Sequence, residues 1–434
     1  MRPVALHSRL AAHGLALAAV TTLVLASALA VPAPRPTQAH TPPPAEAQPT
    51  PPDPALLPLD VQTAPPPGTP RTQGADQQAQ SQKVAFDPSQ GLPQWLHGVQ
   101  DVSLWSGGDP SASLVETVPA GAAFLKPLGP FGDARVEVYF PGDDKHAAAQ
   151  AWVDTSAVEP SSLPTWLSPN LGPGPSLSLP APPQRISDDD PPDVTALHIA
   201  IIDEASGQLL YGLDPNTEVP QASTTKIATT IVALERSPDT SRRIKVTVSA
   251  TAMAARDGSS TMGLEPGRSV TLDTLLHGMM LPSGNDAAEQ VAVALADSRE
   301  QYVQWMNDEA AALGLKHTHF INPSGMDADG HYSSAYDMAM LARYAMRNAT
   351  FRDLASSSRY SSDQYSMLNL NRLLGVYPGA DGVKIGYTDN AQKTIVASAT
   401  RDGHRVYVSL MHSQDLVGDC TRLFNWVWST FQYL

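Results

Sequence analysis

The spacing of hydrophobic and polar residues divides the chain into regions of different character. Short strand-like runs separated by Gly and Pro turns predict a small β domain over residues 84–159. After residue 194 a strand pair is followed by helical periodicity and then by further strands. We therefore expect an α/β (α+β) domain over residues 194–434, whose mixed sheet takes strands from both ends of the domain, with helices between them.

These predicted elements have definite positions. In the small domain, strands are expected over 102–105, 123–125, 135–140 and 151–153. In the larger domain, strands are expected over 198–203, 208–212, 383–387, 394–400 and 406–411. Helices are expected after Ser223 and over 272–280, 286–294, 299–313, 334–346 and about 418–431.

The first residues have the pattern of an export signal. Arg2 and Arg9 precede an apolar run over 10–31, and Ala28-Leu29-Ala30 fits the small-x-small rule for signal peptidase. We expect residues 1–30 to be removed, which makes the protein extracytoplasmic, either in the cell envelope or secreted. The run would also be long enough to anchor the chain if cleavage failed.

Two segments have the composition of linkers. Residues 31–83 are dominated by Pro, Ala, Thr and Gln, and residues 160–193 by Pro and Ser with a closing acidic run. Such segments bury too little apolar surface to offset chain entropy, and their proline content favours an extended spacer.

Charge and cysteine content narrow the function further. The 434-residue chain has a formal net charge of −15, whereas nucleic-acid binding normally needs a concentrated basic surface. We therefore expect no nucleic-acid partner. The only cysteine, Cys420, cannot form an intrachain disulfide.

The stretch Ala222-Ser223-Thr224-Thr225-Lys226 carries the first sign of chemistry. Positions i and i+3 of a helix are neighbours, so the amine of Lys226 can reach the oxygen of Ser223 and take its proton. This arrangement indicates covalent catalysis. A four-residue pattern also recurs by chance, and the alternative is a solvated first turn of a helix.

Two later patterns favour the catalytic interpretation, namely Ser283-Gly284-Asn285 and Lys384-Ile385-Gly386-Tyr387-Thr388. In this order the three patterns resemble the S-x-x-K, S-D-N and K-T-G signature of penicillin-binding proteins and class A β-lactamases. Their context is most similar to the serine-type D-alanyl-D-alanine carboxypeptidases, which are low-molecular-weight penicillin-binding proteins. The resemblance extends over about residues 194–434.

The resemblance implies a serine D-alanyl-D-alanine carboxypeptidase that acts on peptidoglycan stem peptides, is inhibited covalently by β-lactams and uses no cofactor or metal. Ser223 would be the nucleophile and Lys226 its base, while Lys384 would add positive potential and help to bind the terminal carboxylate of the substrate. Ser283 would relay a proton to the leaving amine, and Asn285 would orient the lysine. The expected substrate-binding residues are Lys384, Gly386, Tyr387 (as a backbone oxyanion donor) and Thr388.

One position departs from the family pattern. Ile385 stands where the motif has threonine, whose hydroxyl would bond the carboxylate of a D-alanine terminus or a β-lactam. Losing a hydrogen bond to a charged group would weaken recognition by about one or two powers of ten. Thr388 could compensate, but strand alternation places it on the opposite face from Ile385.

Other functions stay open at this stage. A D,D-endopeptidase or a β-lactamase would use the same machinery, although we identify no glutamate to activate a deacylating water. A non-enzymatic alternative is a wall-binding protein whose penicillin-binding domain is inactive. Asp327, Asp329 and His331 lack the spacing of known zinc or calcium motifs, so we expect no metal.

The small β domain over residues 84–159 also has two interpretations. Its strand order resembles a bacterial Src-homology-three-type wall module, which would contact the cell wall. A β spacer that binds nothing is an equal alternative.

Overall fold

The computed structural model describes residues 95–131, 134–143, 145–161, 181–362 and 364–433. The predicted signal peptide, the first linker and most of the second linker lie outside these residues. Gln80–Leu434 form one compact unit, and the described residues all belong to it.

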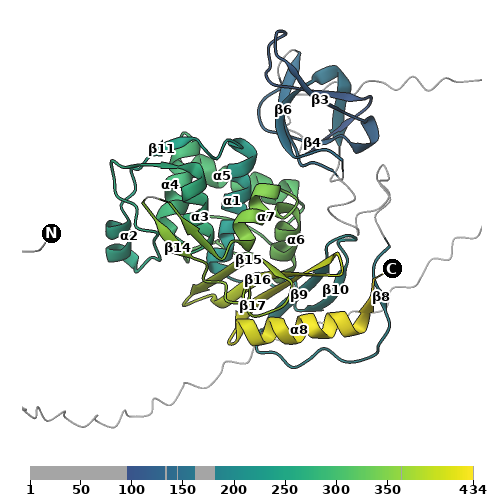
Figure 1. Cartoon of the computed structure of the whole chain (residues 1–434), viewed down its shortest axis with the longest axis vertical. Coiled ribbons are helices and arrows are strands. Elements are labelled where there is room, and N and C mark those ends of the chain that lie inside the picture. Colours follow the sequence, from purple (N-terminus) through teal and green to yellow (C-terminus); the bar gives the residue numbers. More distant parts are fainter. Residues whose placement is uncertain (1–94, 132–133, 144, 162–180, 363, 434) are drawn as a thin grey trace, which may run out of the picture. The chain divides into compact units, whose positions relative to one another are not determined.

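The first described part is an antiparallel β module (Figure 1). Its strands have the sheet order β3-β2-β6-β5-β4-β1-β7. Alternate residues of β5, including Val136 and Val138, are buried in its core. The strands predicted in this region are confirmed. The strands are β1 (Trp95–Gly98), β2 (Val102–Trp105), β3 (Leu114–Val118), β4 (Phe124–Pro127), β5 (Arg135–Phe140), β6 (Ala149–Asp154) and β7 (Val158–Ser161).

The second part is built on a five-stranded antiparallel sheet with the order β10-β9-β17-β16-β15. Strands β9 (His198–Asp203) and β10 (Leu209–Leu213) come early in the sequence, and β15 (Ala380–Thr388), β16 (Gln392–Arg401) and β17 (His404–Ser413) come late. The prediction that the sheet takes strands from both ends of the domain is therefore confirmed. Strand β15 is the edge of the sheet, so one side of it has no neighbouring strand.

Helices cover both faces of this sheet (Figure 1). Strand β9 shows why, since Ile199 and Ile201 pack into the core beneath α8 (Leu416–Thr430), whereas Ala200 and Ile202 pack into the core of the helical layer. Buried on both faces, the strand reads as a continuous apolar run.

The helical layer contains α1 (Lys226–Arg236), α3 (Leu272–Met280), α4 (Asn285–Leu295), α5 (Arg299–Ala312) and α6 (Ala335–Ala345). These confirm the helices predicted from periodicity. Two short helices, α2 (Ala250–Asp257) and α7 (Ala349–Ser356), were not predicted. In the described part of the chain, no helix has both the length and the apolar run needed to cross a membrane.

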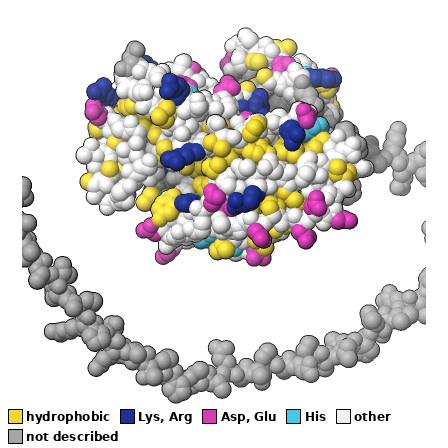
Figure 2. All heavy atoms as spheres, turned by 60° about the horizontal axis from the view of Figure 1, so that its bottom comes forward, with side chains coloured by type: hydrophobic (Ala, Val, Ile, Leu, Met, Phe, Trp, Pro, Cys, Tyr) yellow, Lys and Arg dark blue, Asp and Glu magenta, His cyan; other side chains and the backbone are white. Residues whose placement is uncertain are grey.

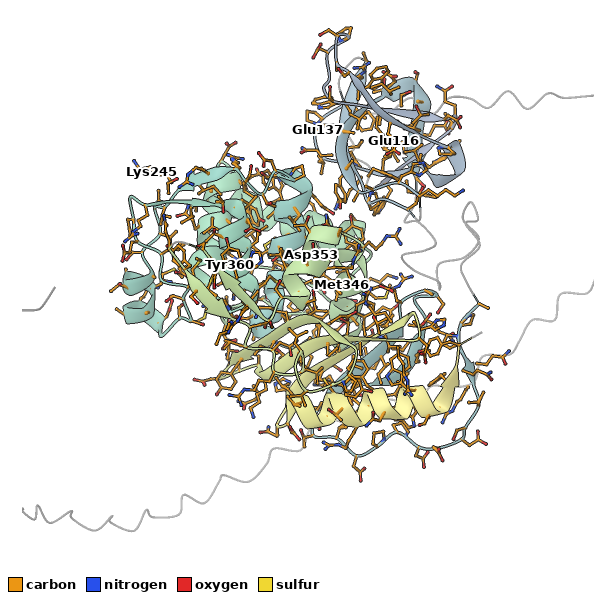
Figure 3. All side chains as sticks on the ribbon, viewed as in Figure 1. Glu116, Glu137, Lys245, Met346, Asp353 and Tyr360 are labelled. Atoms are coloured by element: carbon orange, nitrogen blue, oxygen red, sulfur yellow. The ribbon has the colours of Figure 1, made fainter. Side chains whose placement is uncertain are left out.

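Three two-stranded sheets were also not predicted: β11 (Arg243–Lys245) with β12 (Ser269–Thr271), β13 (Arg359–Ser361) with β14 (Ser366–Leu368), and β8 (Gln184–Arg185) with β18 (Phe431–Gln432). Tyr360, labelled in Figure 3, fixes the second of these sheets on α3. Its ring stacks on His277 with centroids 4.0 Å apart, and its hydroxyl lies 2.9 Å from that of Thr274.

The β module makes buried contacts with the helical layer. The ammonium of Lys126 on β4 bonds to the carboxylates of Glu235 on α1 and Glu309 on α5, and all three side chains are almost fully buried. The indole nitrogen of Trp95 donates to the carbonyl oxygen of Ala312 at 2.6 Å. The contact between Lys126 and the two glutamates pairs groups that would be costly to bury alone.

Candidate active site

Ser223 lies in a 3-10 turn, Ala222–Thr225, that leads directly into α1. The α-helix predicted after Ser223 is confirmed, and it starts three residues later, at Lys226. The turn begins at Ala222, whose φ of 50° lies in the left-handed region that non-glycine residues rarely adopt. This turn presents the Ser223 hydroxyl to a cavity, while the following helix buries Lys226 completely.

The side chain of Lys226 makes three hydrogen bonds. Its Nζ atom lies 2.8 Å from Ser223 Oγ and 2.7 Å from Asn285 Oδ1, and it also contacts the carbonyl oxygen of Ser324. In the neutral amine, two N–H groups suffice for the Asn285 and Ser324 oxygens, and the lone pair then faces Ser223. The geometry is that of a base positioned to accept the serine proton.

Burial is the main cause that shifts the pKa of Lys226 well below its ordinary value, and the charge of Lys384 lowers it further. Glu289 and Asp286 act in the opposite direction. An amine that titrates lower is more often unprotonated at neutral pH, which a general base requires.

Lys384 lies on edge strand β15 and is 1% exposed. Its Nζ atom donates to the carbonyl oxygen of Ile385 at 3.0 Å. Burial lowers the pKa of Lys384 to about 7. The two lysines therefore interact electrostatically although the motifs that carry them are far apart in the sequence.

Strand β15 passes directly against the turn that carries Ser223. A Cβ atom placed on Gly386 would lie 2.8 Å from the amide nitrogen of Ser223 and 2.6 Å from Thr394 Oγ1. Only glycine fits this approach. The next residue, Tyr387, lies on the unpaired edge of the sheet and lines the same cavity as Ser223, with its side chain 59% exposed.

Asn285 and Ser283 differ in their contacts. Asn285 Nδ2 donates to Ser259 Oγ at 3.1 Å, which holds the amide oxygen toward Lys226. Ser283 is buried with φ of 63° and lines the cavity. In the described part of the chain its hydroxyl makes no hydrogen bond, so it is available to a ligand.

Thr388 lies at the far end of β15 and lines the cavity, but its hydroxyl already has protein partners. It donates to Asp327 Oδ1 at 2.7 Å and accepts from the amide of Ala391 at 3.1 Å. A substrate would have to replace or share these bonds.

The cavity that joins these groups has a volume of about 800 Å³. Ser223, Ser283 and Asn285 line it, together with residues 385–389 at the end of β15. A pocket of this size suits a peptide terminus. On the molecular face shown in Figure 2, hydrophobic side chains gather in a band, with basic and acidic side chains scattered around it.

The residues considered as metal ligands are used differently. Asp327 binds Thr388. His331 is buried, and its Nε2 atom lies 3.0 Å from the Oγ1 atom of Thr225, in the turn that carries Ser223. The Nδ1 atom of His331 accepts from the amide of Ile321 at 2.9 Å, and burial lowers its pKa to about 4. No group of His, Cys, Asp or Glu side chains within the described residues is arranged to hold a metal ion.

Comparison with known proteins identifies the family. The family model described as D-alanyl-D-alanine carboxypeptidase, Peptidase_S11, matches residues 185–415, which is more than half of the chain. The chain belongs to this family.

Individual relatives agree. D-alanyl-D-alanine carboxypeptidase DacB2 of Mycobacterium tuberculosis is 37% identical over 247 residues, which cover 54% of this chain and 83% of the relative. DacF of Bacillus subtilis is 36% identical over 212 residues, covering 47% of this chain. The match spans 54% of DacF, so about half of that relative's length has a counterpart here.

Solved structures show the same fold. The Streptomyces K15 DD-transpeptidase is 29% identical, with a TM-score of 0.53 over 56% of this chain and 100% of its own. A D-alanyl-D-alanine carboxypeptidase from Mycobacterium tuberculosis is 33% identical, with a TM-score of 0.52 over 58% of this chain and 98% of its own.

Ile385 is the departure from the carboxypeptidase motif, and its surroundings are apolar. Its side chain packs against the core beneath α8 and also lines the cavity beside Leu416 and Val417. This wall of the cavity therefore offers no hydrogen bond where the family motif has a hydroxyl.

Three features of this carboxypeptidase-family site were missed from the sequence: the Ser324 carbonyl, the Ser259 hydroxyl and the cavity-lining Arg372. Ser324 lies in the turn Asn322–Met326, where no periodic pattern identifies a functional residue. Ser259 and Arg372 lie in loops, and no sequence pattern identified them.

Proposed function

We propose that this protein is a serine D-alanyl-D-alanine carboxypeptidase that removes the last D-alanine of peptidoglycan stem peptides. The observation that carries the proposal is the contact of Ser223 Oγ, at the cavity, with the fully buried amine of Lys226 at 2.8 Å, whose pKa is lowered by burial and by the charge of a second buried lysine, Lys384. Family membership supplies the substrate class. Within this proposal, residues 194–434 are the catalytic domain.

Acylation would begin when Ser223 Oγ attacks the carbonyl carbon between the two D-alanines and its proton passes to Lys226 Nζ. The negative oxygen would lie between the backbone N–H groups of Ser223 and Tyr387, and each such donor typically contributes about two to three powers of ten in rate. The Ser283 hydroxyl would relay the proton to the departing amine as the C–N bond breaks.

Deacylation would reverse the proton path. Water attacks the ester carbon, Lys226 accepts its proton, and the Ser223 oxygen leaves and is reprotonated. Of the described residues that line the cavity, none is a glutamate. This absence favours a carboxypeptidase over a β-lactamase of class A type, which needs a glutamate to activate the deacylating water.

Substrate binding would use the charge of Lys384 and the free edge of β15. The ammonium of Lys384 adds positive potential for the terminal carboxylate of the substrate, and Gly386 to Thr388 offer backbone groups to an extended peptide. β-Lactams would acylate Ser223 as covalent inhibitors. A D,D-endopeptidase would use these same groups, and product analysis on crosslinked muropeptides separates the two activities.

A peptidoglycan substrate would require the activity to lie outside the cytoplasm, in keeping with the export signal predicted at residues 1–30. Contact of the β module with the cell wall is a further proposal, supported by its resemblance to wall modules. Binding of a Ser223→Ala chain to insoluble peptidoglycan, in competition with excess soluble stem peptide, would test it. Retention that the peptide does not compete away supports contact outside the catalytic cavity.

The central test compares the parent with Ser223→Ala on two readouts, labelling by a fluorescent penicillin and release of D-alanine from a D-Ala-D-Ala peptide. Both should be lost in the variant, since removing a serine nucleophile commonly costs about six powers of ten in rate. A matched control is Ser260→Ala, which removes a hydroxyl bonded to the carbonyl of Pro282 at the rim of the cavity. Penicillin labelling without D-alanine release by the parent would contradict the carboxypeptidase assignment.

A further inference from the structure

A buried imidazole lies against both ends of the turn that carries Ser223. His331 is 4% exposed. Its Nε2 atom lies 3.0 Å from the Oγ1 atom of Thr225, the last residue of the turn. The same Nε2 atom lies 3.1 Å from the side-chain amide of Gln221, the residue before the turn. One ring therefore bridges the two residues between which the nucleophile is held.

The other ring nitrogen decides which hydrogen bonds Nε2 makes. The Nδ1 atom of His331 accepts a hydrogen bond from the amide of Ile321 at 2.9 Å, so Nδ1 carries no proton. Burial lowers the pKa of His331 to about 4, so the ring is neutral at pH 7. A neutral imidazole has one N–H group, which must then be on Nε2. The ring consequently donates a hydrogen bond toward the turn.

The side chain of Gln221 supplies an acceptor for this N–H group. Its Oε1 atom is buried and has no hydrogen-bond partner among the described residues. The nitrogen and oxygen of a side-chain amide exchange positions when the amide is turned over. In the turned position, the Gln221 oxygen faces the N–H group of His331 and accepts from it. The N–H group is then shared between Gln221 and the hydroxyl of Thr225, which lie on either side of Ser223.

The turn needs such support because its backbone is strained at Ala222, and strain of this kind persists only where the surroundings hold it. The carbonyl oxygen of Gln221 accepts from Thr394 Oγ1 on β16 at 3.1 Å, which ties the start of the turn to the sheet. His331 adds a second tie, which also holds the end of the turn at Thr225. A misplacement of about 1 Å in a reacting group can cost about 100-fold in rate.

We propose that His331 is a positioning residue for the acylation of Ser223. Its Nε2–H group ties Gln221 to Thr225 and so fixes the conformation of the turn. This conformation holds the Ser223 hydroxyl against the amine of Lys226. The imidazole itself touches no reacting atom and transfers no proton. The inference rests on the proposed function, because it requires Ser223 to be the nucleophile.

The test uses two amide side chains that each imitate one nitrogen of the ring. His331→Gln places an N–H group near the position of Nε2, whereas the shorter side chain of His331→Asn imitates Nδ1 and does not reach the turn. Stopped-flow acylation by a fluorescent penicillin should be about 10- to 100-fold slower in His331→Asn, with the loss in the limiting rate constant and not in the affinity for penicillin. His331→Gln should recover most of this loss.

A matched control is His319→Gln, which changes an exposed histidine of the same segment and should be acylated at the parent's rate. A spectroscopic readout tests the ring in the unaltered protein. ¹⁵N NMR of histidine-labelled protein distinguishes the two neutral tautomers, and the signals that disappear in His331→Gln are those of His331. The proton should be on Nε2 between pH 6 and pH 8.

Three results would each overturn the inference: acylation of His331→Asn at the parent's rate, an equal loss in His331→Asn and His331→Gln, or a proton on Nδ1 of the parent. If His331→Asn does not fold, the tautomer in the parent and the rate of His331→Gln decide. The proposed function survives all of these results if penicillin labels the parent and not Ser223→Ala. A parent that penicillin does not acylate would contradict both proposals.

Discussion

The α carbon of Gly386 approaches the amide nitrogen of Ser223 so closely that a Cβ atom on Gly386 would lie 2.8 Å from that nitrogen. This relationship joins the edge of the sheet to the turn that carries the nucleophile. A side chain at residue 386 would have to push β15 away from the turn, and the proposed oxyanion donors at Ser223 and Tyr387 would separate.

The first prediction follows from this contact. Gly386→Ala should slow acylation by penicillin by about two to three powers of ten, the typical effect of losing one oxyanion donor. Stopped-flow acylation kinetics measure the effect. Gly375→Ala is the matched control, because a Cβ atom there meets nothing within 4 Å. Acylation of Gly386→Ala at the rate of the control would refute the contact as a determinant of activity.

The second prediction concerns pH. Lys226 must lose its proton to act as a base, so kcat/KM should rise with pH through its lowered pKa. Lys384 must keep its proton to attract a carboxylate, and its pKa is about 7, so kcat/KM for a free-acid peptide should fall above about pH 7. The same peptide with a C-terminal amide should show the rise without the same fall. A profile for the free acid that is flat between pH 6 and 9 would contradict the assigned roles.

The third prediction concerns Ile385. Ile385→Thr restores the family hydroxyl and should raise the rate of acylation by benzylpenicillin by about one power of ten. Because Ile385 contacts the core beneath α8, the same change should lower the free energy of unfolding by about 1 kcal/mol. Ile385→Val, which trims the side chain without adding a hydroxyl, separates the two effects. If benzylpenicillin acylates both variants at the same rate, the hydroxyl has no part in recognition here.

The fourth prediction concerns the contact between the β module and the helical layer. Burial and the nearby charge of Glu235 raise the pKa of Glu309 to about 8. A raised pKa means that Glu309 favours folding fully below about pH 4.5, and that this contribution declines as the pH rises to about 8. The decline in the free energy of unfolding amounts to on the order of 3 kcal/mol, and it should be absent in Glu309→Gln.

Denaturant unfolding at pH 5 and pH 8 measures this change. Glu300→Gln, an exposed position on the same helix, should keep the parent's pH dependence. An identical pH dependence in the parent and in Glu309→Gln would show that this carboxyl titrates normally.

Much of the fold could be predicted because its helices bury apolar residues at a regular spacing and its central strands bury continuous apolar runs. The periodicity of α3 identifies its bounds, and the uninterrupted apolar run from Ile199 to Ile202 identifies a buried strand. The unpredicted α2 has only Ala250 and Met253 buried, so it carries no periodic signal. The short strand pairs depend on tertiary contacts such as the stacking of Tyr360 on His277.

The candidate site also contains some groups that could be predicted from the sequence and others that could not. Ser223, Lys226 and Asn285 were expected to meet because their spacing matched a known signature, and the hydrogen bonds of Lys226 bring them together. The Ser324 carbonyl could not be predicted, because its position depends on Asn322 Oδ1, which accepts backbone N–H bonds from Gly325 and Met326. Such a turn is set by a side chain's local geometry rather than by periodicity.

The pairing of β8 with β18 has a practical consequence for engineering. Arg185 lies opposite Phe431 and Gln184 opposite Gln432, so the two ends of the catalytic region emerge side by side. A short peptide bridge could therefore join them. New termini opened at an exposed loop, such as the one around Gly403, would then yield a circularly permuted enzyme, because a Cβ atom at Gly403 would meet nothing within 4 Å.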